Sequence, residues 1–368
     1  MALNILAIEP YYGGSHKAFL DGYAAHSRHR VELLTMPARK WKWRMRGAAL
    51  RLAEMLPASG VDAILASDYL DLAALAGLRP RPMSTVPKAV YFHENQLTYP
   101  LPDEDERDYH YGFTNITTCL AADRVIFNSR YHLESFLEAA DKLIRRMPDC
   151  LPEGVPERIR ERSAVIPVGV DLDSIDRLRA DAAPRSGPLR ILWNHRWEFD
   201  KGPEAFFDAM ARLEEEGGAF ELAVVGQEFR VRPPIFDRAR ERFAPRLRAF
   251  GYVESREDYL RLLLESDVVV STASHEFFGI AVVEAVYAGC VPLLPDGLSY
   301  REILPPRLHP AHLYRTQQEL LTRLSHWAAH PGEVRSMNLR DEMRRFGWER
   351  VAPLLDDAME QTKAGVGQ

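Results

Sequence analysis

The chain has 368 residues, which is enough for two ordinary domains that each bury a core of their own. Hydrophobic residues make up 46% and charged residues 27% of it, as in globular proteins, and no run approaches the roughly 18 apolar residues of a membrane span. The net charge of −6 argues weakly against a nucleic-acid partner. Residues 1–100, however, carry 12 Lys and Arg against 8 Asp and Glu, so an anionic acceptor is best accommodated by this part of the chain.

The cysteines and the first residues bear on the compartment. The three cysteines are odd in number and lack the spacing of metal ligands, which indicates a reducing compartment. The first apolar run, residues 3–8, follows no basic region and is too short for a signal peptide, so we expect a strand there. We therefore expect a cytoplasmic protein without stable membrane association, whose oligomeric state the sequence does not predict.

Short apolar runs that suit buried strands alternate with helical segments along the whole chain. This alternation is typical of an α/β fold in which helices cover parallel sheets. We expect one Rossmann-like domain over 1–170 and a second over 188–335, with a Pro- and Ala-rich linker at 180–188 and a last helix at about 347–364. The expected strands are 3–8, 63–67, 89–92, 125–127, 189–193, 222–226, 249–253, 268–270 and 291–294.

A glycine pair, Gly13 and Gly14, lies between the first strand and the first helix, shortly before His16. Glycines there let the backbone approach a ligand closely, although a tight turn without a ligand would look the same. The pattern is not Gly-x-Gly-x-x-Gly, and no acidic residue follows at dinucleotide spacing, so we do not expect NAD binding.

Six basic residues and two tryptophans, but no acid, fall between residues 39 and 51. Cations neutralise phosphates and indole rings stack on unpaired bases, so this mixture suits a single-stranded RNA loop. A solvated helix start whose tryptophans bury against the sheet is an alternative that composition alone favours, and a basic helix touching anionic lipid is a third. The candidates for acceptor contact are Lys40, Trp41, Lys42, Trp43 and Arg44.

Polar residues follow the strand at 89–92, where ligands bind in parallel sheets. His93 can donate a hydrogen bond to a sugar hydroxyl, and Asn95 lies two residues further on. The acidic run at 103–106 resembles a metal cluster, but consecutive carboxylates do not converge on one ion, so we expect a solvated loop.

In the second half, Asn194, Arg196 and Lys201 lie in one loop after the strand at 189–193, just before a new helix. Two cations held by one loop suit a diphosphate leaving group, whose charge grows as the glycosidic bond breaks. Surface salt bridges are the alternative, although the position at a strand end weighs against it.

Two carboxylates, Glu276 and Glu284, flank the start of a helix that begins near Gly279. Eight residues along a helix span about 12 Å, which is longer than the roughly 5–9.5 Å between the two carboxylates of a glycosidase. The helix N-terminus between them suits a phosphate, so the three features together fit a nucleotide-sugar. A helix cap at Glu276 and a solvated Glu284 are about equally compatible with the spacing.

The second half resembles the retaining GT-B glycosyltransferases of family four. The likeness rests on Glu-x7-Glu at 276–284, Phe278-Gly279, the following Ala288-Gly289-x-x-Pro292, and Arg-x4-Lys-Gly at 196–202. The resemblance implies two Rossmann-like domains that face a central cleft, with Glu276 on the donor sugar, Glu284 on the donor ribose, and Arg196 and Lys201 on the diphosphate. It further implies donor contacts for Gly13, Gly14, Asn194, Phe277, Phe278, Gly279 and Ile280.

The first half resembles the tRNA-queuosine mannosyltransferase family in four stretches: 11–17, 38–44, 91–100 and 107–112. This resemblance implies transfer of mannose from GDP-mannose, with retention and without a metal or another cofactor, to the cyclopentene-diol of queuosine in a tRNA. His93 would then act in catalysis beside Arg196, Lys201 and Glu276. The implied acceptor contacts are His16, Lys40, Trp41, Lys42, Trp43, Arg44 and Asn95.

Three alternatives stay open on the sequence. A retaining transferase with a lipid or glycan acceptor would use the same donor half. A sugar-nucleotide hydrolase or a phosphorylase would release sugar or sugar phosphate. A non-catalytic RNA-binding module belongs to another class, and the joint presence of Arg196, Lys201, Glu276 and Glu284 argues against it. The sequence does not distinguish a GDP from a UDP donor.

Overall fold

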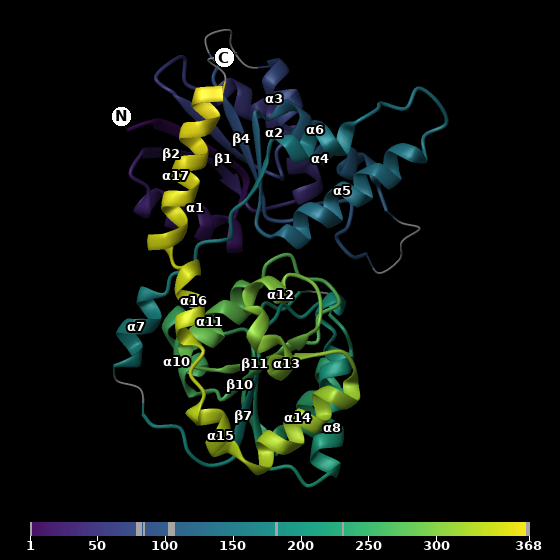
Figure 1. The fold of residues 1–368 in the computed structure, drawn as a ribbon, viewed down its shortest axis with the longest axis vertical. Helices are drawn as coiled ribbons and strands as arrows, with labels where there is room; N and C mark the ends of the chain where they lie inside the picture. The colour runs from purple at the N-terminus through teal and green to yellow at the C-terminus, as the bar shows by residue number, and fades with distance from the viewer. Residues whose placement is uncertain are drawn as a thin grey trace. The chain divides into compact units, whose positions relative to one another are not determined.

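A computed structural model describes residues 2–78, 83, 85–101, 107–180, 183–229 and 232–365. The chain forms two compact units (Figure 1). Unit 1 comprises the residues up to 169 together with the last helix, and unit 2 comprises residues 170–347. Each unit is built around a six-stranded sheet in which every strand pair is parallel, so the predicted α/β fold with two Rossmann-like domains is confirmed.

The sheet of unit 1 has the strand order β2-β1-β3-β4-β5-β6. Its strands and helices are β1 (Asn4–Tyr12), α1 (Gly14–His26), β2 (Arg30–Pro37), α2 (Trp41–Met55), β3 (Ala63–Ser67), α3 (Leu72–Leu78), β4 (Lys88–Phe92), α4 (Tyr109–Ala121), β5 (Arg124–Phe127), α5 (Arg130–Arg145), α6 (Val155–Glu161), β6 (Ser163–Val165) and α17 (Trp348–Gly365).

The sheet of unit 2 has the order β12-β11-β10-β7-β8-β9. Its helices and strands are α7 (Asp173–Arg179), β7 (Leu189–Trp193), α8 (Pro203–Glu215), β8 (Phe220–Val225), α9 (Ile235–Arg242), β9 (Leu247–Gly251), α10 (Arg256–Glu265), β10 (Val268–Val270), α11 (Ile280–Ala288), β11 (Val291–Pro295), α12 (Tyr300–Ile303), α13 (His309–His312), β12 (Leu313–Tyr314), α14 (Gln317–Ala329), α15 (Pro331–Ser336) and α16 (Arg340–Met343), with short 3-10 helices η3 (Phe199–Lys201), η4 (Ala244–Arg246), η5 (Pro306–Leu308) and η6 (Arg344–Phe346).

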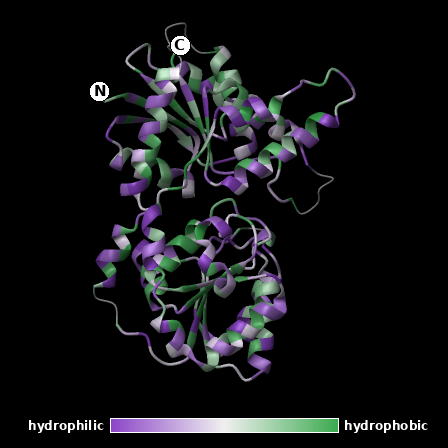
Figure 2. Cartoon of the chain, viewed as in Figure 1, coloured by the Kyte–Doolittle hydropathy of each residue, from purple (hydrophilic) through white to green (hydrophobic). Residues whose placement is uncertain are grey.

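The central strands are buried on both faces, which explains their nearly continuous hydrophobic sequences. All residues of β3 and β10 are buried, and Figure 2 shows hydrophobic residues gathered along the strands of each unit while the helices carry both kinds. The two cores are separate clusters, one around Phe92, Phe127 and Phe136 and one around Trp193 and Phe206. Each unit therefore has its own source of stability.

The linker predicted at 180–188 does not separate the units, because the boundary between them falls between residues 169 and 170. Helix α7 packs on α10 and α11, and the Arg185 guanidinium donates hydrogen bonds to the carbonyl oxygens of Ser266 and Gly289. Residues from 170 onward thus belong to unit 2. At the other end, α17 joins unit 1, where buried Asp356 accepts hydrogen bonds from the Tyr23 hydroxyl and the Arg28 backbone N–H.

Because the strands are parallel, their carboxyl ends meet at one edge of each sheet. In unit 1 this edge brings together the end of β1, residues Asp68 and Tyr69 after β3, and His93 and Glu94 after β4. In unit 2 the loops after β7 and β10, two neighbouring strands, meet in the same way. The polar residues of interest lie at these two edges.

Candidate active site

The loop after β7 and the loop after β10 are joined by backbone contacts. The Thr272 hydroxyl donates hydrogen bonds to the carbonyl oxygens of Lys201 (3.1 Å) and Gly202 (2.9 Å), and the Ser274 N–H donates to the Asp200 carbonyl (2.9 Å). Gly202 has φ +64°, and a Cβ there would lie 2.2 Å from the Thr272 carbonyl oxygen. Only glycine fits this approach, so the Lys-Gly pair fixes the position of Lys201.

Lys201 is a buried lysine with only 6% of its surface exposed. Its Nζ donates to the His275 carbonyl oxygen at 2.8 Å and lies 3.4 Å from Glu276 Oε2 and 3.1 Å from Asp200 Oδ2. A buried ammonium is tolerated when carboxylates and hydrogen-bond acceptors surround it. The two predicted residues Lys201 and Glu276, 75 positions apart, are therefore brought into direct contact.

Arg196 lies beside this pair. Its guanidinium forms an ion pair with Glu198 (3.1 Å) and is partly exposed. Burial alone would raise the pKa of Glu276, but the charge of Lys201, with a smaller contribution from Arg196, brings the pKa below its ordinary value, so Glu276 is ionised. The geometry thus unites three of the residues predicted to act on the donor, Arg196, Lys201 and Glu276.

Two buried histidines at this place were missed by the sequence reasoning. Burial, followed by the charge of Lys201, lowers the pKa of both His195 and His275 to about 4, so both imidazoles are neutral at pH 7. Neutral histidines leave Lys201 and Arg196 as the cations of the site. Only the position of His195 after a strand gave a signal in the sequence.

The side chain of Ser299 fixes the turn from Glu276 to Gly279 through hydrogen bonds. The Ser299 hydroxyl donates to the carbonyl oxygens of Glu276 (3.1 Å) and Phe278 (2.9 Å). Gly279 has φ +102°, and α11 starts directly after it, so its first N–H groups have no partner within the helix. These groups and the partial positive charge of the helix start form the anion-binding feature expected from the sequence.

Phe277 and Phe278 were expected to contact the donor, but their rings do not face a ligand. Both side chains are buried, with Phe277 against the His275 ring (4.3 Å between centroids) and Phe278 against the Phe346 ring (5.4 Å). A donor can therefore meet only their backbone, because the rings are used in packing. Ile280, the first residue of α11, is partly exposed.

Glu284 is not on a solvated face. It accepts hydrogen bonds from Arg256, through Oε1, and from the Tyr259 hydroxyl, through Oε2 at 3.1 Å. Asn194 donates to the same Tyr259 hydroxyl (3.0 Å) and to the Ala281 carbonyl (2.9 Å), while its buried Oδ1 accepts no hydrogen bond from a described residue. Asn194 therefore positions the start of α11 and the Glu284 network.

The glycine pair of unit 1 begins α1. A Cβ on Gly13 would lie 2.5 Å from the Ala38 Cβ, and Gly14 has φ +53° and is exposed. Behind the pair, buried His16 bonds through Nδ1 to Glu9 Oε2 at 2.8 Å. Burial lowers the pKa of His16, but Glu9 and then Asp68 and Glu94 outweigh it and raise the pKa to about 9.

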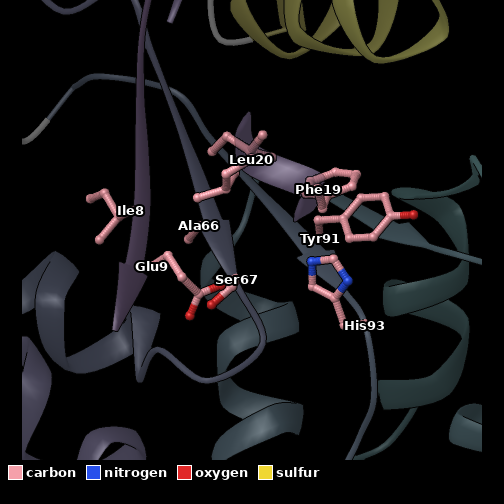
Figure 3. Close-up of a pocket in the computed structure, with 9 residues that line it drawn as sticks. Ile8, Glu9, Phe19, Leu20, Ala66, Ser67, Tyr91 and His93 are labelled. Carbon is pink, nitrogen blue, oxygen red and sulfur yellow. The ribbon is translucent and has the colours of Figure 1, made fainter. Parts of the chain in front are cut away.

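His93 lies next to His16, with 4.2 Å between the ring centroids. Burial, the charge of His16 and that of His132 lower its pKa well below the usual value, so His93 is neutral and can donate a hydrogen bond. Figure 3 shows its ring with Phe19 and Tyr91, and Glu9 beside Ser67, around a hollow with room for about one water molecule. This hollow is too small for a nucleoside.

Asn95 was expected to contact the acceptor, and the structure does not support this. Its side chain is fully buried and closes a turn, with Oδ1 accepting from the N–H groups of Leu97 (3.0 Å) and Thr98 (2.9 Å). Asparagine favours such turns because its amide mimics a backbone group. Asn95 therefore shapes the loop that carries His93 and Glu94.

The basic segment becomes the start of α2. Trp41 is half-buried and its ring lies 5.3 Å from that of Tyr111, whereas Trp43 is 63% exposed, so the alternative in which both tryptophans bury is wrong for Trp43. Lys40 (φ +53°) and Lys42 are exposed and form no ion pair with a described residue. Arg44 is partly exposed and donates to the Pro37 carbonyl (3.4 Å).

Sequence comparisons now assign the chain. The family model of the tRNA-queuosine alpha-mannosyltransferase N-terminal domain matches residues 4–170, and that of glycosyl transferases group 1 matches residues 174–335. A tRNA-queuosine alpha-mannosyltransferase of Drosophila melanogaster is 37% identical over 358 residues, which cover 95% of this chain and 93% of the fly protein. The chain belongs to the tRNA-queuosine mannosyltransferase family. The family resemblance inferred from the motifs is confirmed.

More distant proteins share the architecture of this glycosyltransferase. A GDP-mannose:cellobiosyl-diphosphopolyprenol alpha-mannosyltransferase of Xanthomonas campestris is 24% identical over 67% of this chain and 57% of its own. HepE of Anabaena, solved with UDP and glucose, has a TM-score of 0.67 at 16% identity, with 98% and 100% of the two chains covered. Sucrose-phosphate synthase of Thermosynechococcus elongatus has a TM-score of 0.71 at 15% identity, with 98% and 99% covered. The fold is that of the GT-B glycosyltransferases.

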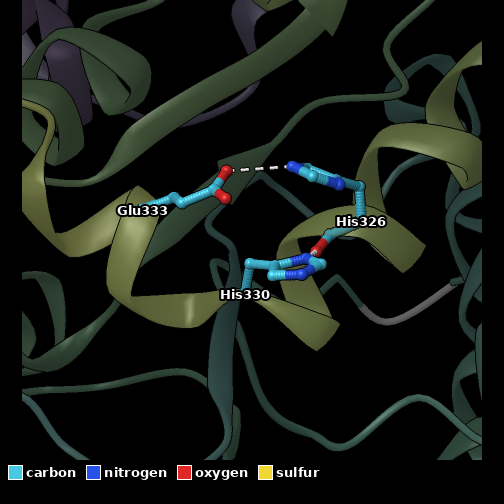
Figure 4. Close-up of side chains that lie close together, drawn as sticks. All are labelled: His326, His330 and Glu333. Atoms are coloured by element: carbon cyan, nitrogen blue, oxygen red, sulfur yellow. Dashed lines mark hydrogen bonds and ion pairs between the residues drawn. The ribbon is translucent and has the colours of Figure 1, made fainter.

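Neither of two other features adds to the site. The acidic run at 103–106 lies outside the described residues. Within the described part of the chain, the group able to hold a metal ion is His326, His330 and Glu333, which is exposed on α14 and α15, where His326 pairs with Glu333 at 2.9 Å (Figure 4). Those helices carry none of the predicted site residues.

In the described part of the chain, no helix is both long and apolar enough to cross a membrane.

Proposed function

We propose that this glycosyltransferase moves mannose from GDP-mannose to queuosine in the anticodon loop of a tRNA, with retention of configuration. The observation that carries the donor half is the contact of buried Lys201 with Glu276, beside Arg196 and the start of α11. The fly relative, which is named for this reaction, supports the acceptor. We also propose that the protein acts in the cytoplasm, where tRNA is present.

In the donor half, Lys201, Arg196 and the N-terminus of α11 stabilise the diphosphate as its negative charge grows. Glu276, ionised and anchored by Lys201, accepts hydrogen bonds from hydroxyls of the sugar, and Glu284 accepts them from the ribose. Cationic side chains supply the charge that a metal ion supplies elsewhere, so we propose that no divalent ion is needed. Undiminished turnover in excess chelator is the expected result; strict dependence on a divalent ion would contradict it.

In the acceptor half, the exposed cations at the start of α2 bind phosphates and Trp43 stacks on a base. Neutral His93 donates to a sugar hydroxyl, and Gly13 and Gly14 let the backbone approach the ligand. A queuosine hydroxyl forms the new bond to the anomeric carbon as the bond to the β-phosphate oxygen breaks. The departing phosphate takes the hydroxyl proton, so no protein base is required.

The test is to incubate the purified protein with queuosine-containing tRNA and a panel of nucleotide-sugars, and to weigh the nucleosides after digestion. We expect a gain of one hexose on queuosine with GDP-mannose and much less with UDP-sugars. No mass gain with any donor would refute the proposal and favour a non-catalytic RNA-binding module.

A lipid-linked acceptor is the second candidate, because the Xanthomonas relative is named for a diphosphopolyprenol acceptor and exposed Trp43 could enter a membrane surface. Flotation with liposomes and a tRNA gel shift separate the two. We expect the shift with tRNA and no flotation. Flotation without a shift would favour the lipid.

A further inference from the structure

Three carboxylates gather at the carboxyl edge of the unit 1 sheet: Glu9 on β1, Asp68 after β3 and Glu94 after β4. We call them the anionic cluster. Glu9 and Asp68 are buried, and Glu94 is partly exposed. Burial, followed by the negative charges of Glu94 and Glu9 against the opposing charge of His16, raises the pKa of Asp68 to about 8, so Asp68 holds a proton at pH 7 until a further cation lowers that pKa. Carboxylates crowded in this way are stabilised by any further cation that reaches them.

One cation, His16, is already present and is committed to Glu9. Asp68 receives the His93 backbone N–H on Oδ1 (3.0 Å). Glu94 receives the Tyr69 hydroxyl (2.5 Å) and the Gln96 amide (3.1 Å), both on Oε1. Its Oε2 accepts no hydrogen bond from a described residue. The partly exposed carboxylate of the cluster thus has a free acceptor oxygen.

Aromatic rings lie around Tyr69, whose hydroxyl donates to this carboxylate. The Tyr69 ring lies 5.2 Å from the Tyr11 ring, 5.0 Å from the His16 ring and 6.1 Å from the Trp41 ring. Tyr11 and Trp41 are partly exposed, so ring surface remains for a ligand. A carboxylate oxygen together with partly exposed aromatic rings in the same region suits an organic ammonium group.

The charge next to the cluster has the opposite sign. Arg39, Lys40 and Lys42 are exposed and form no ion pair with a described residue. Phosphates are attracted to these side chains and repelled by the cluster. A nucleic acid in which one base carries a positive charge satisfies both.

We propose that unit 1 recognises its acceptor as a cation, with Glu94 binding the ammonium group of the modified base while the basic segment holds the surrounding phosphates. This inference rests on the proposed function for the identity of the acceptor. Queuosine carries its cyclopentene-diol on an aminomethyl linkage, whose secondary amine is protonated at neutral pH, whereas guanosine at the same position is neutral there. Glu94 is then the residue that distinguishes modified from unmodified tRNA.

Glu94→Gln is a matched test, because the amide oxygen of glutamine can still accept both hydrogen bonds made by Glu94 and only the charge is lost. The full-length protein, without donor, is titrated with one tRNA that carries either queuosine or guanosine at the first anticodon position. The wild type should prefer the modified tRNA by about tenfold or more, as for a hydrogen bond to a charged group. Glu94→Gln should bind both tRNAs with the weaker affinity.

Two further variants complete the test. Lys42→Ala should weaken the binding of both tRNAs equally and keep the preference for the modified one. Tyr69→Phe, which keeps the ring but frees Glu94, should reduce the preference by a smaller factor. A wild type without preference, or a Glu94→Gln protein that keeps the full preference or loses affinity for both tRNAs equally, would overturn the inference.

Because no donor is present, this outcome is independent of transfer. A protein that prefers modified tRNA but transfers no mannose would refute the proposed function and leave this inference standing. Mannose transfer by a Glu94→Gln protein that still prefers the modified tRNA would support the proposed function and refute this inference.

Discussion

The two units place their polar residues at the same edge of similar sheets but differ in the groups buried there. In unit 2 the buried cation is Lys201, supported by Arg196, and the nearby histidines are neutral. In unit 1 carboxylates predominate, and His16 is the histidine that carries a charge. Under the two proposals, the same architecture binds an anionic diphosphate in one unit and a cationic base in the other, because the residues after the strands set the sign.

The largest effect is expected from the cations of unit 2. Arg196→Ala and Lys201→Ala should each lower turnover by about 10²-fold or more, as for a lost oxyanion donor. Lys201→Ala should also destabilise the protein by about 3–5 kcal/mol, because it leaves Asp200 and Glu276 without their buried partner. Steady-state kinetics and thermal unfolding measure the two effects. Near-normal turnover in both variants would refute the assignment of the donor site.

The second-largest effect is expected from Glu284→Gln. The change keeps the shape of the side chain but removes a charged acceptor for the ribose, so donor affinity should fall by about tenfold. Titration calorimetry with GDP measures it. Glu257→Gln, an exposed carboxylate on α10 paired with Arg261, is the control and should bind GDP normally. Equal affinity in both variants would show that Glu284 serves only the Arg256 and Tyr259 contacts.

How far the sequence predicted each site differs between the units. The residues of the donor site lie in two short motifs, and the second places Glu276 just before α11 and Glu284 within it. Spacing along the chain left the helix-cap alternative open, and the family resemblance supplied the proposed roles. The sequence could not show that Phe277 and Phe278 turn inward, since this depends on His275 and Phe346.

The anionic cluster was not predicted. Glu9 lies on β1, whereas Asp68 and Glu94 lie in the loops after β3 and β4, and the three meet only because these strands are neighbours in the sheet. Strand order is a tertiary property that short motifs do not carry. Asn95 was misassigned for a related reason, because a polar residue at a strand end can serve a turn as well as a ligand.

A smaller effect is expected at the surface of unit 1. Trp43→Ala should weaken tRNA binding by about tenfold, as for one lost stacking contact, without changing the melting temperature, because the side chain is 63% exposed. Leu50→Ala, an exposed apolar residue of the same helix, is the control for lost surface area. Gel shifts at fixed salt measure both. Equal losses in the two variants would point to area rather than stacking.

The contrast between the units also predicts opposite responses of their stability to pH. In unit 1 the pKa of His16 is about 9, above its ordinary 6.5, so its contribution is complete below pH 6.5 and is lost as the pH rises toward 9. Neutral His93, whose pKa lies well below 6.5, adds an acid loss to unit 1, but from one group against the two of unit 2. In unit 2 the pKa of His195 and His275 is about 4, so the stability of their neutral forms is present above pH 6.5 and is lost as the pH falls toward 4. Each group changes the free energy of unfolding by at most about 1.4 kcal/mol per pH unit.

Proteolysis in urea, with the fragments assigned to each unit, measures these responses at pH 5, 7 and 9. We expect unit 2 to be cleaved first at pH 5 and unit 1 first at pH 9. His16→Gln removes the titrating group of unit 1, so it should flatten the alkaline loss of that unit and leave the acid response of unit 2 unchanged. If both units lost stability in the same direction, the opposite polarity of the two sites would not be set by these buried histidines.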